Sequence, residues 1–424
     1  MNAKETIQAL GQEKAGKLMA DLYGSLKTAE NRTRYEKLVD QYVKTFGDGD
    51  LKLFSSPGRT EISGNHTDHN HGKVLAGSIN LDCAGVAAKN NSDQIRIVSE
   101  TYNQDFTIDL NQLEVSPKAA GTIDLVKGML KGFTEFGYQI GGFNAYITSN
   151  VISAAGVSSS AAFEMLICSM LNTFFNEGKM DTVAYAHIGK YAENHYWNKA
   201  SGLLDQMACA VGGLISIDFV NPAEPAVEKI DFDMEKYGYR LCITDTKGSH
   251  ADLTDEYAAI PKEMKLVAKY FGKEVLCGIS INDVLDNITD LRKKLGDRCV
   301  LRALHFIYEN KRVQKEVSAL KAGNIRAFLD DVKASGNSSF KYLQNVYSNQ
   351  DIKNQNVSLA LFVSEMFLGQ NGVCRVHGGG FAGTIQAFVK NGYVENYKYE
   401  MDKIFGKDSC KDLRIRKYGG IKVL

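Results

Sequence analysis

The chain has 424 residues, of which 44% are hydrophobic, so it can bury a sizeable core, and its length favours two domains. Lysine and arginine together number 50, and so do aspartate and glutamate, which gives a formal net charge of zero. A neutral chain has no general field to attract nucleic acid or an anionic membrane, so we expect neither as a partner. Any anion that binds must be held by a local site.

Eight cysteines are scattered along the chain without a Cys-x-x-Cys pair, and most of them lie in apolar runs. This pattern is typical of reduced, buried thiols and not of a disulfide framework or a zinc site. The first twenty residues carry charges such as Lys4 and Glu13 and no apolar segment, and no apolar run reaches the roughly 18 residues of a membrane span. We therefore expect a soluble, cytoplasmic protein that is a monomer or a weak oligomer.

The first half of the chain begins with a helical stretch, 1–46, that is broken at Gly24 and Gly47. A short strand at 51–54 precedes Ser55-Ser56-Pro57-Gly58, a sequence that predicts a turn. Strand-like alternation or helix-like runs then follow, with strands expected over 79–89, 94–99, 143–148 and 214–219 and helices over 163–175 and 182–197.

The second half follows a proline-containing segment, 221–225, which is the best candidate for a domain boundary. We therefore place the two domains at 1–222 and 223–424. The later elements are predicted as strands over 240–244 and 384–389 and helices over 255–271, 300–322, 325–345 and 357–368. A glycine loop occupies 378–383.

A run of small residues just before the helix predicted at 163–175 has the character of a phosphate site. It reads Gly156, Val157, Ser158, Ser159, Ser160, Ala161 and Ala162. Glycine lets the backbone approach a ligand, and a helix N-terminus offers N–H groups and partial positive charge to an anion. A serine hydroxyl there can also bind Mg²⁺. An ordinary capped helix is the alternative interpretation.

Residues 56–72 form a second loop rich in polar side chains. Its histidines, asparagines, arginine and aspartate suit a polyhydroxylated ligand. The same loop also allows a metal site made of His66, Asp68, His69 and His71, or a solvated polar turn. A third element places Glu193 and Asp205 twelve residues apart, and both could be structural caps near helix ends. With a phosphate loop nearby they suggest a Mg²⁺ ligand and a base or charge stabiliser.

Together, these elements resemble the GHMP kinases and, among them, the galactokinase branch. Pro57-Gly58-Arg59, Gly64, His66-Thr67-Asp68, Asn70 and Gly72 are similar to the galactokinase signature. The 156–162 segment is similar to the ATP-binding motif of the family, and the 378–383 loop is similar to its third motif. Glu193, Asp205 and Tyr257 fall at the spacing of the family.

The resemblance implies a role for each matching residue. Asp205 matches the catalytic aspartate, which accepts or shares the proton of the sugar hydroxyl, and Arg59 matches its cationic partner. Ser160 and Glu193 match Mg²⁺ ligands. The implied sugar contacts are Asn65, His66, Asp68, Gly202 and Tyr257, and the implied contacts to ATP are Gly156, Val157, Ser158, Ser159, Ser160, Ala161, Gly379 and Gly380.

The resemblance also implies a fold and a reaction. The fold is of the α+β class, with a ribosomal-S5-domain-2-like N-terminal domain that carries the helical extension 1–46, and a ferredoxin-like C-terminal α/β domain. The active site lies in the cleft between them, and a last strand could return to the N-terminal domain. The implied reaction is the phosphorylation of a hexose at its anomeric hydroxyl by ATP and Mg²⁺, with galactose as the first choice of sugar.

The chain departs from the family at two positions of the sugar loop. Galactokinases usually place Glu before the His-Thr-Asp triplet and Tyr after it, whereas this chain has Asn65 and His69. Loss of a carboxylate at the edge of the sugar would make room for another C6 substituent, so a kinase for a uronic acid or another hexose is the second hypothesis. A sugar and ATP sensor without catalysis is the third, but the complete serine run, Arg59 and Asp205 favour an enzyme.

Overall fold

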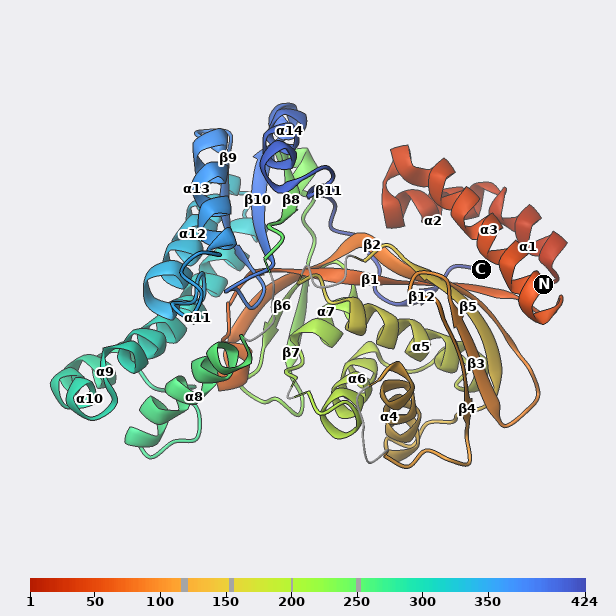
Figure 1. Ribbon diagram of the computed structural model, residues 1–424, viewed down its shortest axis with the longest axis horizontal. Coiled ribbons are helices and arrows are strands. Elements are labelled where there is room, and N and C mark those ends of the chain that lie inside the picture. Colours follow the sequence, from red (N-terminus) through yellow and green to blue (C-terminus); the bar gives the residue numbers. More distant parts are fainter. Residues whose placement is uncertain (116–120, 152–155, 200, 249–252) are drawn as a thin grey trace.

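The computed structural model describes residues 1–115, 121–151, 156–199, 201–248 and 253–424 of the chain, which fold around two β-sheets (Figure 1). The strands of the first sheet are β1 (Lys52–Ser63), β2 (Lys73–Lys89), β3 (Gln94–Ser99), β4 (Gln104–Asp109), β5 (Phe143–Ser149), β6 (Leu214–Asp218), β7 (Ala226–Ile230) and β12 (Ile421–Lys422). Their main path follows the order β12-β1-β2-β5-β3-β4, and β6 pairs with both β2 and β7.

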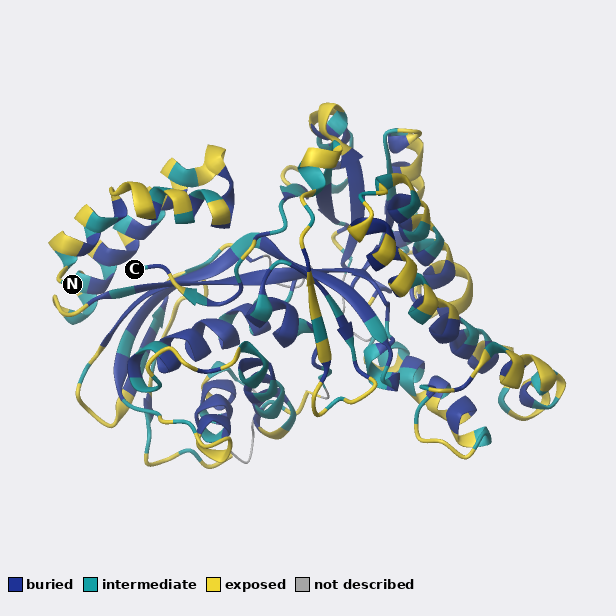
Figure 2. Ribbon diagram, turned by 180° about the vertical axis from the view of Figure 1, so that it is seen from behind, coloured by how far each residue is buried: buried dark blue, intermediate teal, exposed yellow. Residues whose placement is uncertain are grey.

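Helices cover both faces of the first sheet (Figures 1 and 2). One face carries α1 (Ala3–Leu10), α2 (Glu13–Tyr23) and α3 (Thr28–Phe46), and the other carries α4 (Thr122–Glu135), α5 (Ser159–Phe175), α6 (Thr182–Tyr196) and α7 (Leu204–Val211). The apolar sequence of α5 is explained by its position, since nearly all of it is buried against the sheet and its neighbouring helices. The helices predicted within 1–46 and near 163–175 and 182–197 are thus confirmed.

The N-terminal helices are attached to the sheet by a buried polar cluster around Asp82. This carboxylate is fully buried, and it accepts hydrogen bonds from Arg34 Nη1 at 2.6 Å and from the Tyr23 hydroxyl at 2.6 Å. Burial alone would raise the pKa of Asp82, but the charges of Arg34 and Arg416 outweigh it and lower the pKa. Since a buried carboxylate needs such partners, the helical extension is part of the domain.

The second sheet is antiparallel and contains β8 (Tyr239–Asp245), β9 (Gly372–His377), β10 (Thr384–Lys390) and β11 (Cys410–Leu413) in the order β11-β8-β10-β9. Between β8 and β9 lie α8 (Thr254–Tyr270), α9 (Ile281–Asp286), α10 (Ile288–Leu295), α11 (Asp297–Lys321), α12 (Ile325–Ser338), the π-helical turn η4 (Ser339–Leu343) and α13 (Asn356–Leu368), while α14 (Val394–Phe405) joins β10 to β11. The succession strand, helices, two strands, helix, strand is that of a ferredoxin-like unit.

Two strands that follow residue 222 in the sequence, β7 and β12, belong to the first sheet. β7 pairs with β6 and so extends the first sheet beyond residue 222, and β12 returns to pair with β1 close to the end of the chain. The boundary at 222 stays a prediction, and the pairing of β7 favours a position after Ile230.

The predicted turn at Pro57 and Gly58 is wrong, because β1 continues through both residues. The register between β1 and β2 shifts between Pro57 and Arg59, so the strand accommodates the proline at an irregularity. A Cβ on Gly58 would lie only 2.6 Å from the carbonyl oxygen of Val157, so glycine here allows β1 to approach the 156–162 segment.

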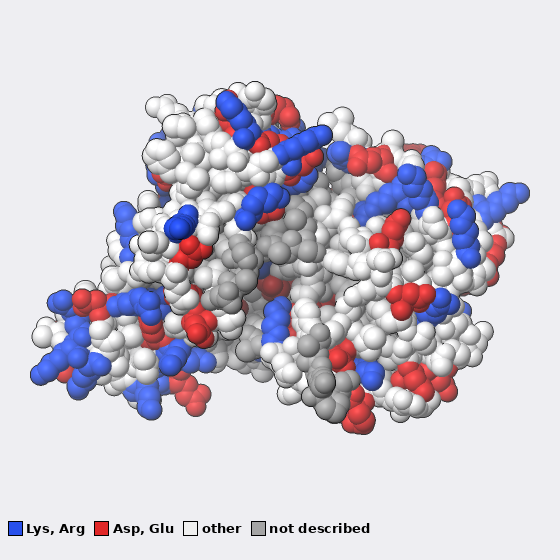
Figure 3. All heavy atoms as spheres, in the orientation of Figure 1, with Lys and Arg blue, Asp and Glu red and all other residues white. Residues whose placement is uncertain are grey.

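The surface shows no segregation of charge on the face in Figure 3, where basic and acidic side chains are intermingled. None of the described helices is both long enough and apolar enough to cross a membrane. Of the eight cysteines, seven are buried and Cys277 is partly exposed.

Candidate active site

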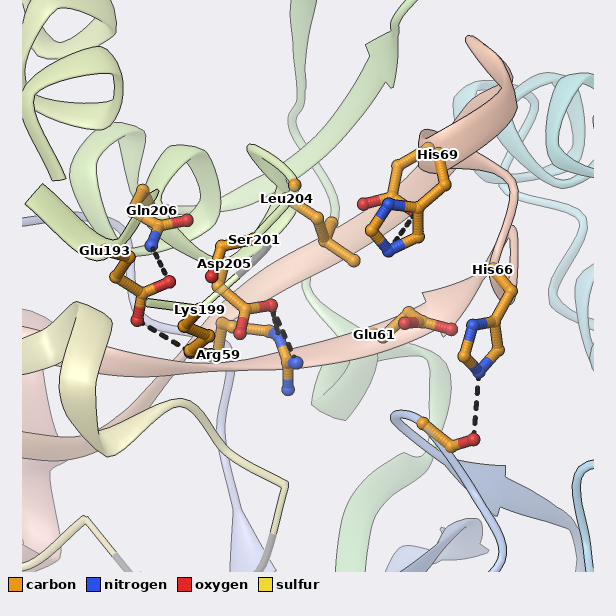
Figure 4. A pocket seen from close by; sticks show the side chains of 13 residues that line it. Arg59, Glu61, His66, His69, Glu193, Lys199, Ser201, Leu204, Asp205 and Gln206 are labelled. Carbon is orange, nitrogen blue, oxygen red and sulfur yellow. Dashed lines mark hydrogen bonds and ion pairs between the residues drawn. The ribbon is translucent and has the colours of Figure 1, made fainter. Parts of the chain in front are cut away.

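A cavity of about 210 Å³ lies where the two sheets meet (Figure 4). Its wall comes from β1, the loop after β1, α6, residues 199, 201 and 202 between α6 and α7, the start of α7 and the loop that joins β9 to β10. The lining residues are Arg59, Glu61, His66, Asp68, His69, Glu193, Lys199, Ser201, Gly202, Leu204, Asp205, Gln206 and Gly379. Residues predicted from separate motifs therefore meet in one place.

Arg59 and Asp205 form an ion pair in this wall. Arg59 Nε donates to Asp205 Oδ1 at 2.9 Å, and Arg59 Nη2 lies 2.8 Å from the same oxygen. Burial would raise the pKa of Asp205, but the charges of Arg59 and Lys199 lower it below its usual range. Asp205 is therefore ionised at neutral pH and can accept a hydrogen bond from a ligand hydroxyl.

The start of α5 is tied to this ion pair. Arg59 donates its backbone N–H to the Val157 carbonyl at 3.0 Å, and its Nη1 donates to the Gly156 carbonyl. Ser158 stands at the N-cap position with a left-handed φ of 61° and makes no capping hydrogen bond through its side chain. The interpretation as an ordinary capped helix is therefore not supported, and among the described residues no side chain caps the first N–H groups of α5, which can face an anion.

The glycine loop between β9 and β10 lies against the same segment. A Cβ added to Gly378 would be 3.6 Å from the Gly156 carbonyl oxygen. Gly379 contributes to the cavity wall, and its carbonyl oxygen is 2.9 Å from His66 Nε2. The 156–162 segment, the 378–383 glycine loop and the polar loop after β1 are thus in direct contact. More than 200 residues of sequence separate Gly156 from Gly378.

Ser160 and Glu193 lie together beside the cavity. The Ser160 hydroxyl donates to Glu193 Oε1 at 3.1 Å, and Lys199 Nζ lies 2.6 Å from the same oxygen. Gln206 Nε2 donates to the other oxygen of Glu193 at 3.1 Å. A hydroxyl and a fully buried carboxylate side by side are oxygen donors of the kind that suits Mg²⁺.

The polar loop after β1 contains the turn η2 (Asp68–Asn70) and brings His66, Asp68 and His69 to the cavity. His66 adopts a left-handed backbone with φ of 59°, which is uncommon outside glycine. Gly202 faces Asp68, and a Cβ on Gly202 would collide with the Asp68 carboxylate. Glycine at 202 therefore permits this close approach.

Helix α11 holds the polar loop from behind. Ser63 Oγ and Gly64 N donate to Glu309 Oε1 at 3.1 and 3.2 Å, and His305 Nε2 is 3.0 Å from the Asn65 carbonyl oxygen. Asn310 Oδ1 accepts from the backbone N–H of Lys73 at 2.7 Å. These bonds fix the loop at both of its ends.

Asn65 and Tyr257, both predicted to contact the sugar, are not among the residues that line the cavity. The Asn65 side chain is fully buried and engaged with neighbouring protein groups. The Tyr257 hydroxyl donates to the Gly380 carbonyl at 2.7 Å, and its ring packs edge-on against Phe381. Asn65 is therefore buried behind the wall, and the sugar contact of Tyr257 stays a prediction.

Sequence reasoning missed five residues of the wall, Glu61, Lys199, Ser201, Leu204 and Gln206. One signal could have found Glu61: it lies two residues after Arg59 on the same strand, and side chains at that spacing point to the same side of a strand. The alternative metal site in the polar loop finds no support, since the described residues contain no metal-binding group of three or more His, Cys, Asp or Glu side chains.

Comparison with known proteins identifies two matching regions. Residues 40–89 match the galactokinase galactose-binding signature, and residues 124–213 match the N-terminal domain of GHMP kinases. The galactokinase of Clostridium tetani is 28% identical over 380 residues, which cover 89% of this chain and 94% of that protein. The galactokinase of Lactobacillus helveticus is 29% identical over 379 residues, with 87% and 94% covered.

Solved structures show the same likeness. The galactokinase of Lactococcus lactis complexed with galactose superposes with a TM-score of 0.79 at 25% identity, and the match covers 92% of this chain and 99% of that one. A mevalonate kinase gives a TM-score of 0.60 at 16% identity over 86% of this chain and 99% of the other, which is a likeness of fold alone.

Proposed function

We infer that the chain belongs to the galactokinase branch of the GHMP kinases and that it catalyses the ATP-dependent phosphorylation of galactose. The expected two-domain GHMP fold and the expected sugar kinase are thereby confirmed. The structural observation that carries the function is one cavity that combines the Arg59–Asp205 pair, Glu193 and the polar loop with the start of α5 beside it.

Asp205 and Arg59 are proposed to act on the sugar hydroxyl. The ionised Asp205 accepts a hydrogen bond from the anomeric hydroxyl of galactose and takes or shares its proton as the oxygen attacks the terminal phosphorus of ATP. Arg59 keeps the carboxylate ionised, and its guanidinium at the Gly156 carbonyl brings positive charge to the phosphate loop. The products are galactose 1-phosphate and ADP.

The phosphates of ATP are proposed to bind at the N-terminus of α5, between residues 156–161 and the glycines at 379 and 380. Ser160 and Glu193 would hold Mg²⁺ there, and their oxygen donors 3.1 Å apart fit that ion. When bound, Mg²⁺ offsets the negative charge of the phosphates. Lys199, paired with Glu193, adds a further cation at the same edge of the cavity. ATP and free sugars meet in the cytoplasm, which is the location we propose.

The hypothesis of a uronic acid kinase loses its basis. It assumed that Asn65 stands at the edge of the sugar and leaves an uncharged space there. Asn65 is buried behind the wall, and a different carboxylate, Glu61, lines the cavity. The carboxylate of a uronic acid would lie close to the carboxylate of Glu61, and two such groups disfavour each other. A neutral hexose is therefore favoured.

A sugar panel in a coupled ADP-release assay tests the proposed function. Galactose, galacturonate, glucose, arabinose and N-acetylgalactosamine are compared at saturating ATP and Mg²⁺. We expect galactose to give the highest kcat/KM and galacturonate to give little turnover. Absence of ADP release with galactose, together with turnover of another sugar, would overturn the assignment.

A further inference from the structure

The Asn65 side chain has no hydrogen-bonding capacity left for a ligand. Its Nδ2 donates to Glu61 Oε1 at 2.7 Å and to the Gly378 carbonyl at 2.8 Å. Its Oδ1 accepts from Asn345 Nδ2 at 2.7 Å and from Ser339 Oγ at 3.2 Å. An amide group has two N–H donors and two lone pairs on oxygen, so all four are used within the protein.

The side chain of Glu61, unlike that of Asn65, lines the cavity. It follows Arg59 by two positions in the same regular stretch of β1, so both side chains face the cavity, as Figure 4 shows. Its backbone is fixed from the second sheet, because Gln386 Nε2 donates to the Glu61 carbonyl at 2.8 Å. Asn65 binds Oε1, and no described residue donates a hydrogen bond to Oε2.

Burial of a carboxylate costs free energy unless both of its oxygens accept hydrogen bonds. Glu61 is only 5% exposed, and burial raises its pKa to about 7 although Arg375, Arg59 and Asn65 act in the opposite direction. A hydroxyl donated by a ligand would supply the hydrogen bond that Oε2 lacks. Galactose presents several hydroxyls besides the one that is phosphorylated, so the ligand of the proposed function has the required group.

We propose that Glu61 determines sugar specificity in this chain: its Oε2 accepts a hydrogen bond from a galactose hydroxyl that is not phosphorylated, while Asn65 positions the carboxylate through Oε1. This inference rests on the proposed function and deepens it. The carboxylate that galactokinases usually carry directly before the His-Thr-Asp triplet is absent here, and the contacting pair of Glu61 and Asn65 supplies one from four residues earlier.

The test combines Glu61→Gln with galactose and its 2-, 3-, 4- and 6-deoxy analogues. We expect Glu61→Gln to raise the KM for galactose by roughly 10- to 100-fold, the range of one hydrogen bond to a charged group, and to leave the KM for ATP unchanged. One deoxy analogue should be a poor substrate of the unsubstituted protein and should lose little further in the variant. Glu316→Gln is the matched control, because Glu316 is fully buried and does not line the cavity.

The outcomes separate the two proposals. If the unsubstituted protein does not release ADP with galactose, the kinase assignment fails before any variant is compared. If Glu61→Gln keeps the KM of the unsubstituted protein for galactose and for every analogue, the role of Glu61 is rejected and the kinase assignment stands. Thermal unfolding of each variant is recorded beside the kinetics.

A measurement on the unsubstituted protein covers the case in which Glu61→Gln does not fold. The ionised form of Glu61 accepts the hydroxyl, so the KM for galactose should rise as pH falls through about 7, and the analogue that lacks the contacted hydroxyl should show no such step. The cations that act on Glu61 are Arg375 and Arg59, and burial lowers the pKa of His66 and His377.

The wall also contains the titratable side chains of Asp68, His69, Glu193, Lys199 and Asp205. The step in KM should survive His69→Asn if Glu61 causes it. A step that His69→Asn removes, or one that appears equally with all deoxy analogues, would contradict the proposal.

Discussion

Asp205→Asn tests the catalytic pair most directly. Asparagine keeps the shape of the side chain and can still accept from Arg59, but it cannot take a proton. Both bonds from Arg59 end on Oδ1, so Oδ2 is the oxygen that Arg59 leaves for the sugar hydroxyl. Loss of a general base costs about 10²- to 10⁴-fold in rate, which corresponds to about 3 to 5 kcal/mol of barrier. We expect kcat to fall by that factor.

Unfolding cannot account for a loss of this size. Removing one partner of a fully buried ion pair costs about 3–5 kcal/mol, but the Asp205 side chain is 32% exposed, and Arg59 keeps the Gly156 carbonyl as an acceptor. The cost should therefore be nearer 1–2 kcal/mol, which leaves a protein of ordinary stability folded.

The assay is coupled ADP release at saturating galactose and ATP, with ATP binding followed by calorimetry. Asp218→Asn is the matched control, because Asp218 is 30% exposed and paired with Lys73, outside the cavity. We expect the control to keep full turnover and Asp205→Asn to keep ATP affinity. If Asp205→Asn retains more than about a tenth of the turnover of the unsubstituted protein, Asp205 is not the proton acceptor.

Three further predictions concern Ser160, Glu61 and Glu309. Ser160→Ala removes one of the two proposed oxygen ligands, so the Mg²⁺ concentration for half-maximal rate should rise by about tenfold in a Mg²⁺ titration at unchanged KM for galactose, and an unchanged titration would count against the site. The KM for galactose should increase from pH 8 to pH 6, and Glu61→Gln should flatten this profile. Burial would raise the pKa of Glu309, but His305, Arg312 and Arg375 lower it to about 2, so its contribution to stability is present above about pH 4.3 and is lost as pH falls towards 2. Glu309→Gln should therefore remove part of the acid dependence of the free energy of unfolding measured in urea, and a variant with the same acid profile would contradict this origin.

The sequence predicted most of the charged residues of the cavity because their chemistry constrains them strongly, but it missed Glu61 and Lys199. Arg59, His66, Asp68, Glu193 and Asp205 come from different elements, yet all of them line one space. The proposed function assigns each a role by its type: a cation for phosphate, carboxylates for a proton or a metal, and polar groups for a sugar. Such requirements remain visible as motifs even when no element is known.

The course of β1 could not be predicted in the same way. Pro57-Gly58 has the composition of a turn, and local preference favours one. In the structure, the proline sits where the register with β2 shifts, and the glycine is there because the Val157 backbone lies against it. That neighbour is about 100 residues away in sequence, so the reason for the glycine is tertiary and has no local signature.

The same limit applies to the polar loop after β1, where matching residues one position at a time assigned Asn65 to the sugar. A motif fixes a residue to a position, whereas the ligand meets a group in space. Glu61 and Asn65 are four positions apart and joined by a 2.7 Å hydrogen bond, so a carboxylate on either one lies in the same small region. A carboxylate is therefore still present in this region, held by the amide of Asn65. The absence of Glu at position 65 does not by itself imply a change of sugar.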